Sequence, residues 1–181
     1  VRMGLGEVEK LVLAMGVMKV FKQSGLPKNY FKEFWTHSIM VGLTTKESIA
    51  SSRLPGKKKI DEKSIFTAGL FHAIGRLILF QCFPNYFNDV FNLCRESDLD
   101  LYEIENNELG INHAEIGANL LDQWNLPEFI CDSVMYQYEP DKCKPETKIY
   151  AQAVHLSNFS VSCNGNPLPE GNLPKRFSQG A

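Results

Sequence analysis

The fold is decided by the stretch Phe66-Thr67-Ala68-Gly69-Leu70-Phe71-His72-Ala73-Ile74-Gly75-Arg76-Leu77-Ile78-Leu79. One imidazole, that of His72, stands in this otherwise apolar segment, which predicts a buried helix. A buried imidazole is also a candidate metal ligand, because a neutral ring nitrogen binds metal ions. The residues that surround His72 in the fold therefore decide whether it has a chemical role.

Helical periodicity continues along the chain, and we find no run of alternating strands, no internal repeat and no low-complexity segment. In the second helix, the expected inward residues are Phe31, Phe34, Trp35, Ile39, Gly42, Leu43 and Ile49. Asp100 with Glu103, and Asn112 with Glu115, have the form of N-terminal capping boxes. We expect helices over about 6–23, 30–53, 61–83, 84–94, 100–110, 112–124, 129–138 and 146–161.

The composition is that of an ordinary globular protein with one core, since the 181 residues are 44% hydrophobic and 22% charged. A net charge of -2 gives no basic surface for nucleic acid, and the lysine run 57–59 is expected to be a solvated loop. The Asn-, Gly- and Pro-rich sequence after Cys163 ends the last helix. We therefore expect a helical domain over 1–162 and an extended or mobile tail over 163–181.

The cysteines indicate a reducing compartment, because the five are odd in number and form no CxxC pair. No run approaches the roughly 20 apolar residues that span a bilayer, and no signal-peptide pattern opens the chain. We therefore expect a cytoplasmic protein without membrane contact. Because the chain begins at Val1 and not at Met, we also expect it to belong to a longer polypeptide.

Several segments together carry a family resemblance, in their order and spacing. They are Arg2-Met3-Gly4-Leu5-Gly6-Glu7-Val8 through Phe21, Phe34-Trp35-Thr36-His37-Ser38, Ala68-Gly69-Leu70-Phe71-His72-Ala73-Ile74-Gly75, Asn112-His113-Ala114-Glu115-Ile116-Gly117-Ala118-Asn119-Leu120-Leu121 and Trp124-Asn125-Leu126-Pro127. Over roughly residues 2–160 the chain resembles the HDOD family, a regulatory branch of the HD phosphohydrolase superfamily. The resemblance implies an all-α helical bundle of the HD-domain/HDOD type, here without the family's usual N-terminal helices.

The resemblance also implies a degenerate metal site. His37, His72 and His113 match histidine ligand positions of catalytic HD proteins, but Ala73 replaces the aspartate that follows the second histidine. Gln137, Tyr138 and Asn158 stand at the remaining ligand positions. They are weak or inert ligands, because hard divalent cations prefer carboxylates. The expected cleft contains no catalytic residue and no cofactor, and it is lined by His37, His72, Ala73, Arg76, His113, Gln137, Tyr138 and Asn158.

Two interpretations of the three histidines remain open. Three imidazoles with an open fourth position can hold zinc, so His37, His72 and His113 could form a mononuclear divalent-metal site. The favoured interpretation makes each one a core histidine that is hydrogen-bonded within the protein. Arg76, one turn beyond His72, could offer its guanidinium to a phosphate or carboxylate, although an ordinary salt bridge is favoured for it.

The function implied by the resemblance is that of a non-catalytic bacterial signal-transduction module, which acts through protein contacts or by binding a small ligand in the degenerate cleft. Its expected partners are signalling proteins or fused receiver and cyclic-dinucleotide domains, with no nucleic acid and no membrane. Self-association into a homo-oligomer is left open. The alternative is a metal-dependent phosphohydrolase that uses the remaining histidines.

Overall fold

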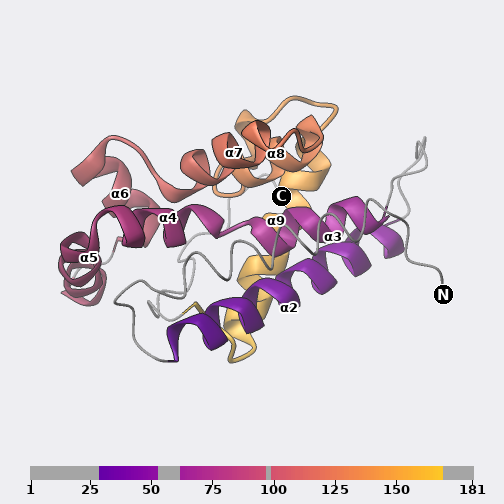
Figure 1. Cartoon of the computed structure of the whole chain (residues 1–181). Helices are drawn as coiled ribbons and strands as arrows, with labels where there is room; N and C mark the ends of the chain where they lie inside the picture. The colour runs from indigo at the N-terminus through magenta and orange to yellow at the C-terminus, as the bar shows by residue number, and fades with distance from the viewer. Residues whose placement is uncertain (1–28, 53–61, 97–98, 169–181) are drawn as a thin grey trace.

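A computed structural model describes residues 29–52, 62–96 and 99–168, and this part of the chain is helical with no strand (Figure 1). The prediction of an all-α fold is thus confirmed. The helix expected over 6–23, the first residue of the helix expected over 61–83 and the lysine run 57–59 lie outside the described residues. The elements are α2 (Tyr30–Ser51), α3 (Glu62–Phe71), α4 (Ile74–Cys82), α5 (Pro84–Glu96), α6 (Leu101–Leu109), α7 (His113–Gln123), α8 (Glu128–Met135), the 3₁₀ turn η1 (Pro140–Lys142) and α9 (Lys148–Cys163).

The core lies between α2, α3 and α4 on one side and α7, α8 and α9 on the other (Figure 1). Helices α2 and α3 pack along each other, α9 packs across α2, and α7 packs on both α4 and α8. Helices α5 and α6 lie at one end of the molecule and bury a smaller apolar cluster of Val90, Cys94, Leu101 and Ile104. Side chains from α2, α4, α7 and α8 can therefore meet inside one fold.

Capping fixes the helix boundaries that the sequence predicted best. Asp100 accepts from the backbone N–H of Glu103, whose side chain accepts from the N–H of Asp100, so the capping box is confirmed. Asn112 accepts from the N–H of Glu115, but the Glu115 carboxylate accepts from the Asn112 amide and not from its backbone. Gly110 ends α6 with φ of 67°.

The prediction of one continuous central helix was wrong, because the helix breaks at His72 and Ala73 into α3 and α4. At the break, the backbone carbonyl of His72 accepts a hydrogen bond from Gln137 Nε2 at 2.7 Å. Gln137 follows the C-terminal end of α8, so a side chain from a distant segment satisfies this buried carbonyl. Within the described residues, the 19-residue stretch Ser64–Cys82 is long and apolar enough to span a membrane, with a hydropathy of 1.5. The expectation that no apolar run approaches the length of a membrane span was therefore wrong for this stretch. However, 72% of the stretch is buried inside the fold.

The inward face of α2 differs from the predicted one. Ile39 and Leu43 are 42% and 52% exposed, whereas His37, Ser38 and Thr45 are buried. Phe34, Trp35, Gly42 and Ile49 are buried as predicted, so the prediction was right for these four residues and wrong for Ile39 and Leu43. Three polar residues share the core face, which hydrophobicity alone does not reveal.

Glycines bring backbones together at two helix crossings. A Cβ on Gly69 would lie 2.7 Å from the Gly42 Cα, and a Cβ on Gly75 would lie 2.0 Å from the His113 carbonyl oxygen. The first contact holds α3 against α2, which carries His37. The second holds α4 against the start of α7, which carries His113.

Candidate functional site: a histidine pair and a buried carboxylate cluster

His37 and His72 face each other across the contact between α2 and α3. Their Nε2 atoms are 3.3 Å apart, and the side chains are 1% and 0% exposed. His37 Nδ1 lies 2.6 Å from the carbonyl oxygen of Asn166, and His72 Nδ1 lies 2.7 Å from that of Gly69. Because a carbonyl oxygen only accepts hydrogen bonds, both Nδ1 atoms carry a proton and donate it.

These contacts turn two Nε2 lone pairs toward each other if both rings are neutral. Burial is the largest cause that lowers the pKa of His72 well below 6.5, and the neighbouring His37 lowers it further. His72 is therefore neutral at pH 7, and its Nε2 is an acceptor. A hydrogen bond between the two Nε2 atoms therefore requires a proton on one of them.

The second cluster is a chain of buried polar groups from α4, α6, α7 and the segment after α8. Glu105 Oε2 lies 2.5 Å from His113 Nδ1 and accepts from the His113 backbone N–H at 2.8 Å. His113 Nε2 lies 2.9 Å from the Tyr138 hydroxyl, to which Arg76 Nη2 donates at 3.0 Å. A carboxylate, an imidazole, a phenol and a guanidinium thus follow one another.

The direction of these hydrogen bonds follows from the carboxylate. A neutral His113 ring that donates from Nδ1 to Glu105 accepts the Tyr138 proton at Nε2. Burial raises the pKa of Tyr138 to about 12, although Arg76 acts against the rise. Tyr138 is therefore a neutral donor at pH 7, and the phenol links Arg76 to His113. The Tyr102 ring stacks on Tyr138, with centroids 4.6 Å apart.

Gln137 and His155 connect the histidine pair to α9. Gln137 Nε2 donates to the His72 carbonyl, and the Gln137 carbonyl accepts from His155 Nδ1 at 2.7 Å. Among the described residues, Gln137 Oε1 is buried without a hydrogen-bond partner. Asn158 is 5% exposed on α9, but the hydrogen bonds described above do not include it.

The three histidines are not one ligand set. His37 and His72 form one pair, whereas His113 contacts Glu105 and Tyr138. In the described part of the chain, no three His, Cys, Asp or Glu side chains are grouped as metal ligands. Ala73 is fully buried beside His72 and offers no donor atom. The residues present do not fit a catalytic metal centre, which needs three protein ligands and an open position.

Glu105, Tyr102 and His155 belong to this region, and the sequence analysis did not single them out. Glu105 lies in a helix that the sequence marks as acidic, yet its side chain is 0% exposed. It follows Leu101 and Ile104 at helical spacing, on the face that α6 buries. A carboxylate on the apolar face of a helix was the signal that could have identified it.

The beginning of the predicted tail packs on α2. The Asn166 carbonyl accepts from His37, and Leu168 is 6% exposed in the main core. A pocket of about 430 Å³ lies here, lined by Lys32, Glu33, Thr36, Gly165, Asn166, Pro167 and Leu168. Residues 169–181 lie outside the described residues, and the domain boundary at 162 stays a prediction.

Comparison with known proteins places the chain in a family. A protein of Treponema pallidum (strain Nichols) is 20% identical over 174 residues, which cover 96% of this chain and 33% of that protein. The crystal structure of an HDOD domain protein from Geobacter sulfurreducens matches with a TM-score of 0.72 and 22% identity, over 97% of this chain and 56% of that one. A proposed signal transduction protein from Marinobacter aquaeolei VT8 matches with a TM-score of 0.72 and 26% identity, over 88% of this chain and 35% of that one. The chain thus spans about a third to a half of these relatives. Because the family model for the HDOD domain matches residues 1–140, this chain belongs to the HDOD domain family.

Proposed function

We propose that this chain is a non-catalytic regulatory module of bacterial, cytoplasmic signal transduction that works through contacts with other proteins. In this module, the polar contacts of the cleft that corresponds to a hydrolase centre hold the helices together. The degenerate cleft remains a candidate site for a small ligand, although the ring nitrogens of its three histidines already contact protein atoms.

One observation carries the proposal. All six ring nitrogens of His37, His72 and His113 lie within hydrogen-bond distance of protein atoms. Histidines that hold the fold together in this way do not need a substrate to satisfy them. Ala73 removes the carboxylate that would orient a metal-bound water, so the site lacks the group that hydrolysis needs most.

The relatives support a regulatory role. The Marinobacter aquaeolei protein that matches over 88% of this chain is a proposed signal transduction protein, and this chain covers 35% of it. A module that forms part of longer proteins exerts its effect through its neighbours, for which the family resemblance suggests receiver and cyclic-dinucleotide domains.

Hydrolysis of bis(p-nitrophenyl) phosphate by the full chain, with added Mn²⁺, tests the proposal. We expect no turnover above the Mn²⁺ blank, and no difference between the unmodified chain and His72→Ala. Turnover that disappears in His72→Ala but persists in the surface variant Lys46→Ala would overturn the proposal.

The histidine pair favours a second candidate, a phosphohydrolase that uses the remaining histidines. Both Nδ1 atoms donate to carbonyl oxygens and both Nε2 atoms face one point, as in metal-bound histidines whose other nitrogen is held by a carbonyl. Two imidazoles supply only part of a coordination sphere. Stoichiometric Zn²⁺ or Mn²⁺ in the purified chain, lost in His37→Ala, would support this candidate.

A further inference from the structure

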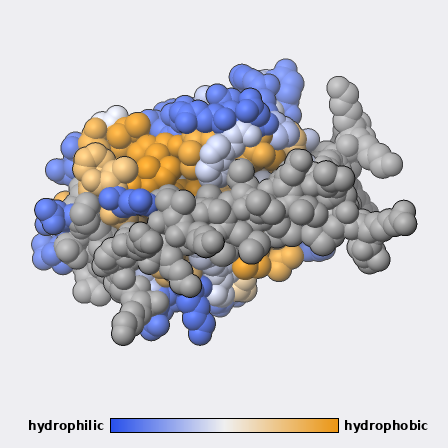
Figure 2. All heavy atoms as spheres, viewed as in Figure 1, coloured by the Kyte–Doolittle hydropathy of each residue, from blue (hydrophilic) through white to orange (hydrophobic). Residues whose placement is uncertain are grey.

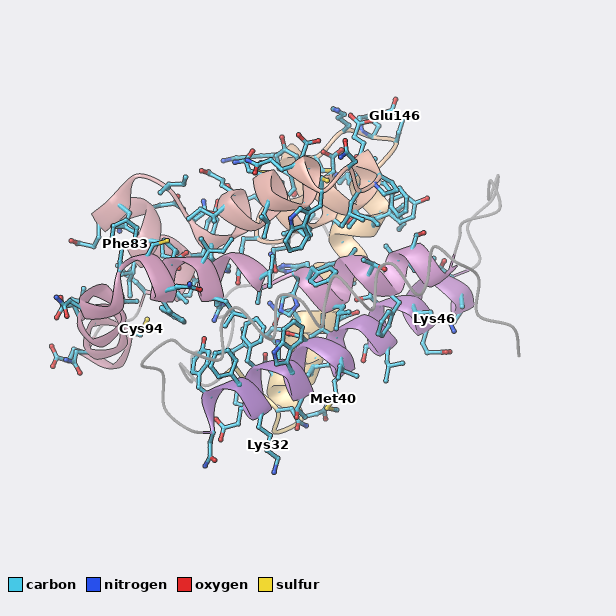
Figure 3. The ribbon with its side chains drawn as sticks, in the orientation of Figure 1. Lys32, Met40, Lys46, Phe83, Cys94 and Glu146 are labelled. Carbon is cyan, nitrogen blue, oxygen red and sulfur yellow. The ribbon has the colours of Figure 1, made fainter. Side chains whose placement is uncertain are left out.

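The end of the molecule formed by α4, α5 and α6 exposes apolar side chains that a folded core would normally cover. Phe83 is 55% exposed, more than the other large hydrophobic residues of the described part. Four more apolar residues on these elements and their connections are at least one-third exposed: Leu93, Leu99, Leu109 and Ile111. Figure 2 shows apolar surface over this end of the molecule, and Figure 3 places Phe83 there.

Local sequence forces Phe83 outward. Pro84 follows it and disfavours helical backbone at the preceding residue, so α4 ends at Cys82 and Phe83 has φ of -133° and ψ of 67°. Pro84 then starts α5, where its fixed φ suits the first turn. The ring of Phe83 therefore lies between two helices without belonging to the core of either.

Acidic side chains outnumber basic ones in this part of the sequence. Residues 77–112 contain seven carboxylate side chains and one arginine, whereas the whole chain has a net charge of only -2. In the described part of α4, α5 and α6, the exposed charged side chains are Asp89, Glu96 and Glu108, and Arg76 is only 7% exposed. An exposed apolar surface bordered by carboxylates complements a helix with one apolar face and basic flanks.

We propose that Phe83, Leu109 and Ile111, bordered by Asp89, Glu96 and Glu108, form a docking surface for a basic amphipathic helix of a partner protein. The inference rests on the proposed regulatory function and names the kind of partner. The apolar residues supply the buried contact, and the carboxylates select basic flanks over acidic ones.

Binding of synthetic peptides to the full chain tests this surface. The first probe is a Leu/Lys peptide with Leu at helical i, i+3, i+4 and i+7 spacing, and the second has Glu in place of Lys. We expect the basic peptide to shift backbone amide signals of α4–α6 and the acidic peptide to leave them unchanged. Equal binding of both peptides, or shifts confined to other helices, would overturn the proposal.

Two double variants sharpen the test. Leu109→Ser with Ile111→Ser should weaken binding of the basic peptide about tenfold. The matched control, Ile39→Ser with Leu43→Ser, removes two similarly exposed residues from α2 and should leave the affinity within about twofold. Equal losses in the two variants would mean nonspecific apolar binding and contradict the proposal.

Two further outcomes separate this inference from others. A chain that dimerises in sedimentation experiments, and becomes monomeric in the Leu109/Ile111 variant, would show that the surface binds a second copy and would overturn the proposed partner. Phosphodiester turnover would overturn the proposed function without changing peptide binding, so the two failures are distinguishable.

Discussion

Glu105 and His113 form a fully buried acid–imidazole contact, with Glu105 Oε2 2.5 Å from His113 Nδ1 and both side chains 0% exposed. The same oxygen accepts from the His113 backbone N–H at the first turn of α7. One carboxylate on α6 therefore fixes both the position of α7 and the tautomer of its first histidine. Because His113 then contacts Tyr138, this carboxylate also couples α6 to the segment after α8, beside the stacked rings of Tyr102 and Tyr138.

Removing the Glu105 carboxylate should destabilise the fold more than removing an exposed charged side chain. Glu105→Ala deletes the acceptor of two buried hydrogen bonds, and we expect a loss of about 3 kcal/mol in the free energy of unfolding. Glu105→Gln keeps an acceptor oxygen and should lose about 1 kcal/mol. Urea denaturation measures both, with the exposed Glu108→Ala as the control, expected within about 0.5 kcal/mol of the unmodified chain. Equal stability of the Glu105→Ala and Glu108→Ala variants would contradict this prediction.

Gly75→Ala should disrupt the contact between α4 and α7. The added Cβ would lie 2.0 Å from the His113 carbonyl oxygen, a backbone atom that no side-chain rotation can move away. We expect a loss of about 3 kcal/mol, seen as a lower melting temperature. Gly110→Ala is the control, since no atom lies within 4 Å and only its φ of 67° opposes a side chain. That variant should lose only about 1 kcal/mol, and a larger loss than that of Gly75→Ala would refute the steric argument.

Stability should fall as the solution is acidified through the range in which unfolded histidine titrates. The folded pKa of His72 is lowered by burial, so below pH 6.5 the unfolded chain binds a proton that the folded chain does not. The contribution of His72 to the free energy of unfolding is fully present above pH 6.5. It is lost toward lower pH by up to about 1.4 kcal/mol per pH unit. Urea denaturation at pH 7.5 and 5.5 measures the slope. The His72→Asn variant should be less stable, but its free energy of unfolding should change less between pH 7.5 and 5.5. An unchanged slope in this variant would show that His72 does not cause the pH dependence.

Placing a carboxylate beside His72 should make the stability of the protein depend on metal. Ala73→Asp buries a charge at a fully enclosed position, and we expect a loss of about 3 kcal/mol without metal. The new carboxylate would add a donor to those of His37 and His72, so Mn²⁺ should raise the melting temperature of this variant. Ala73→Asn, which lacks the charge, serves as the control and should gain little from Mn²⁺. Identical responses of the two variants would show that His37, His72 and a carboxylate at position 73 do not form a metal site.

Thiol reactivity should divide the five free cysteines into two groups. Cys82 and Cys163 are exposed, whereas Cys94, Cys131 and Cys143 are buried. Burial raises the pKa of Cys131 to about 11 and also raises that of Cys143, so both thiols remain protonated at pH 8. Labelling with iodoacetamide, followed by mass spectrometry, should modify Cys82 and Cys163 first. Early modification of Cys131 in the folded chain would contradict this order.

The sequence by itself determined the helical class, the positions of most helix ends and the family. Caps are local, so the box at Asp100 and the N-cap at Asn112 could be identified from residues three positions apart. The motif positions His37, His72 and His113 were predicted as the polar residues of the cleft, and the structure buries all three.

Only the tertiary structure decided how those residues are used. At the break after Phe71, the His72 carbonyl accepts from Gln137, which is 65 residues away in the chain. The separation of His113 from the histidine pair depends on Glu105, whose burial requires α6 to pack on α7. Hydrophobic periodicity measures the spacing of apolar residues, so it gives no information about polar partners that are distant in sequence. Buried polar groups must find such partners, and their hydrogen bonds fixed the arrangement of this site.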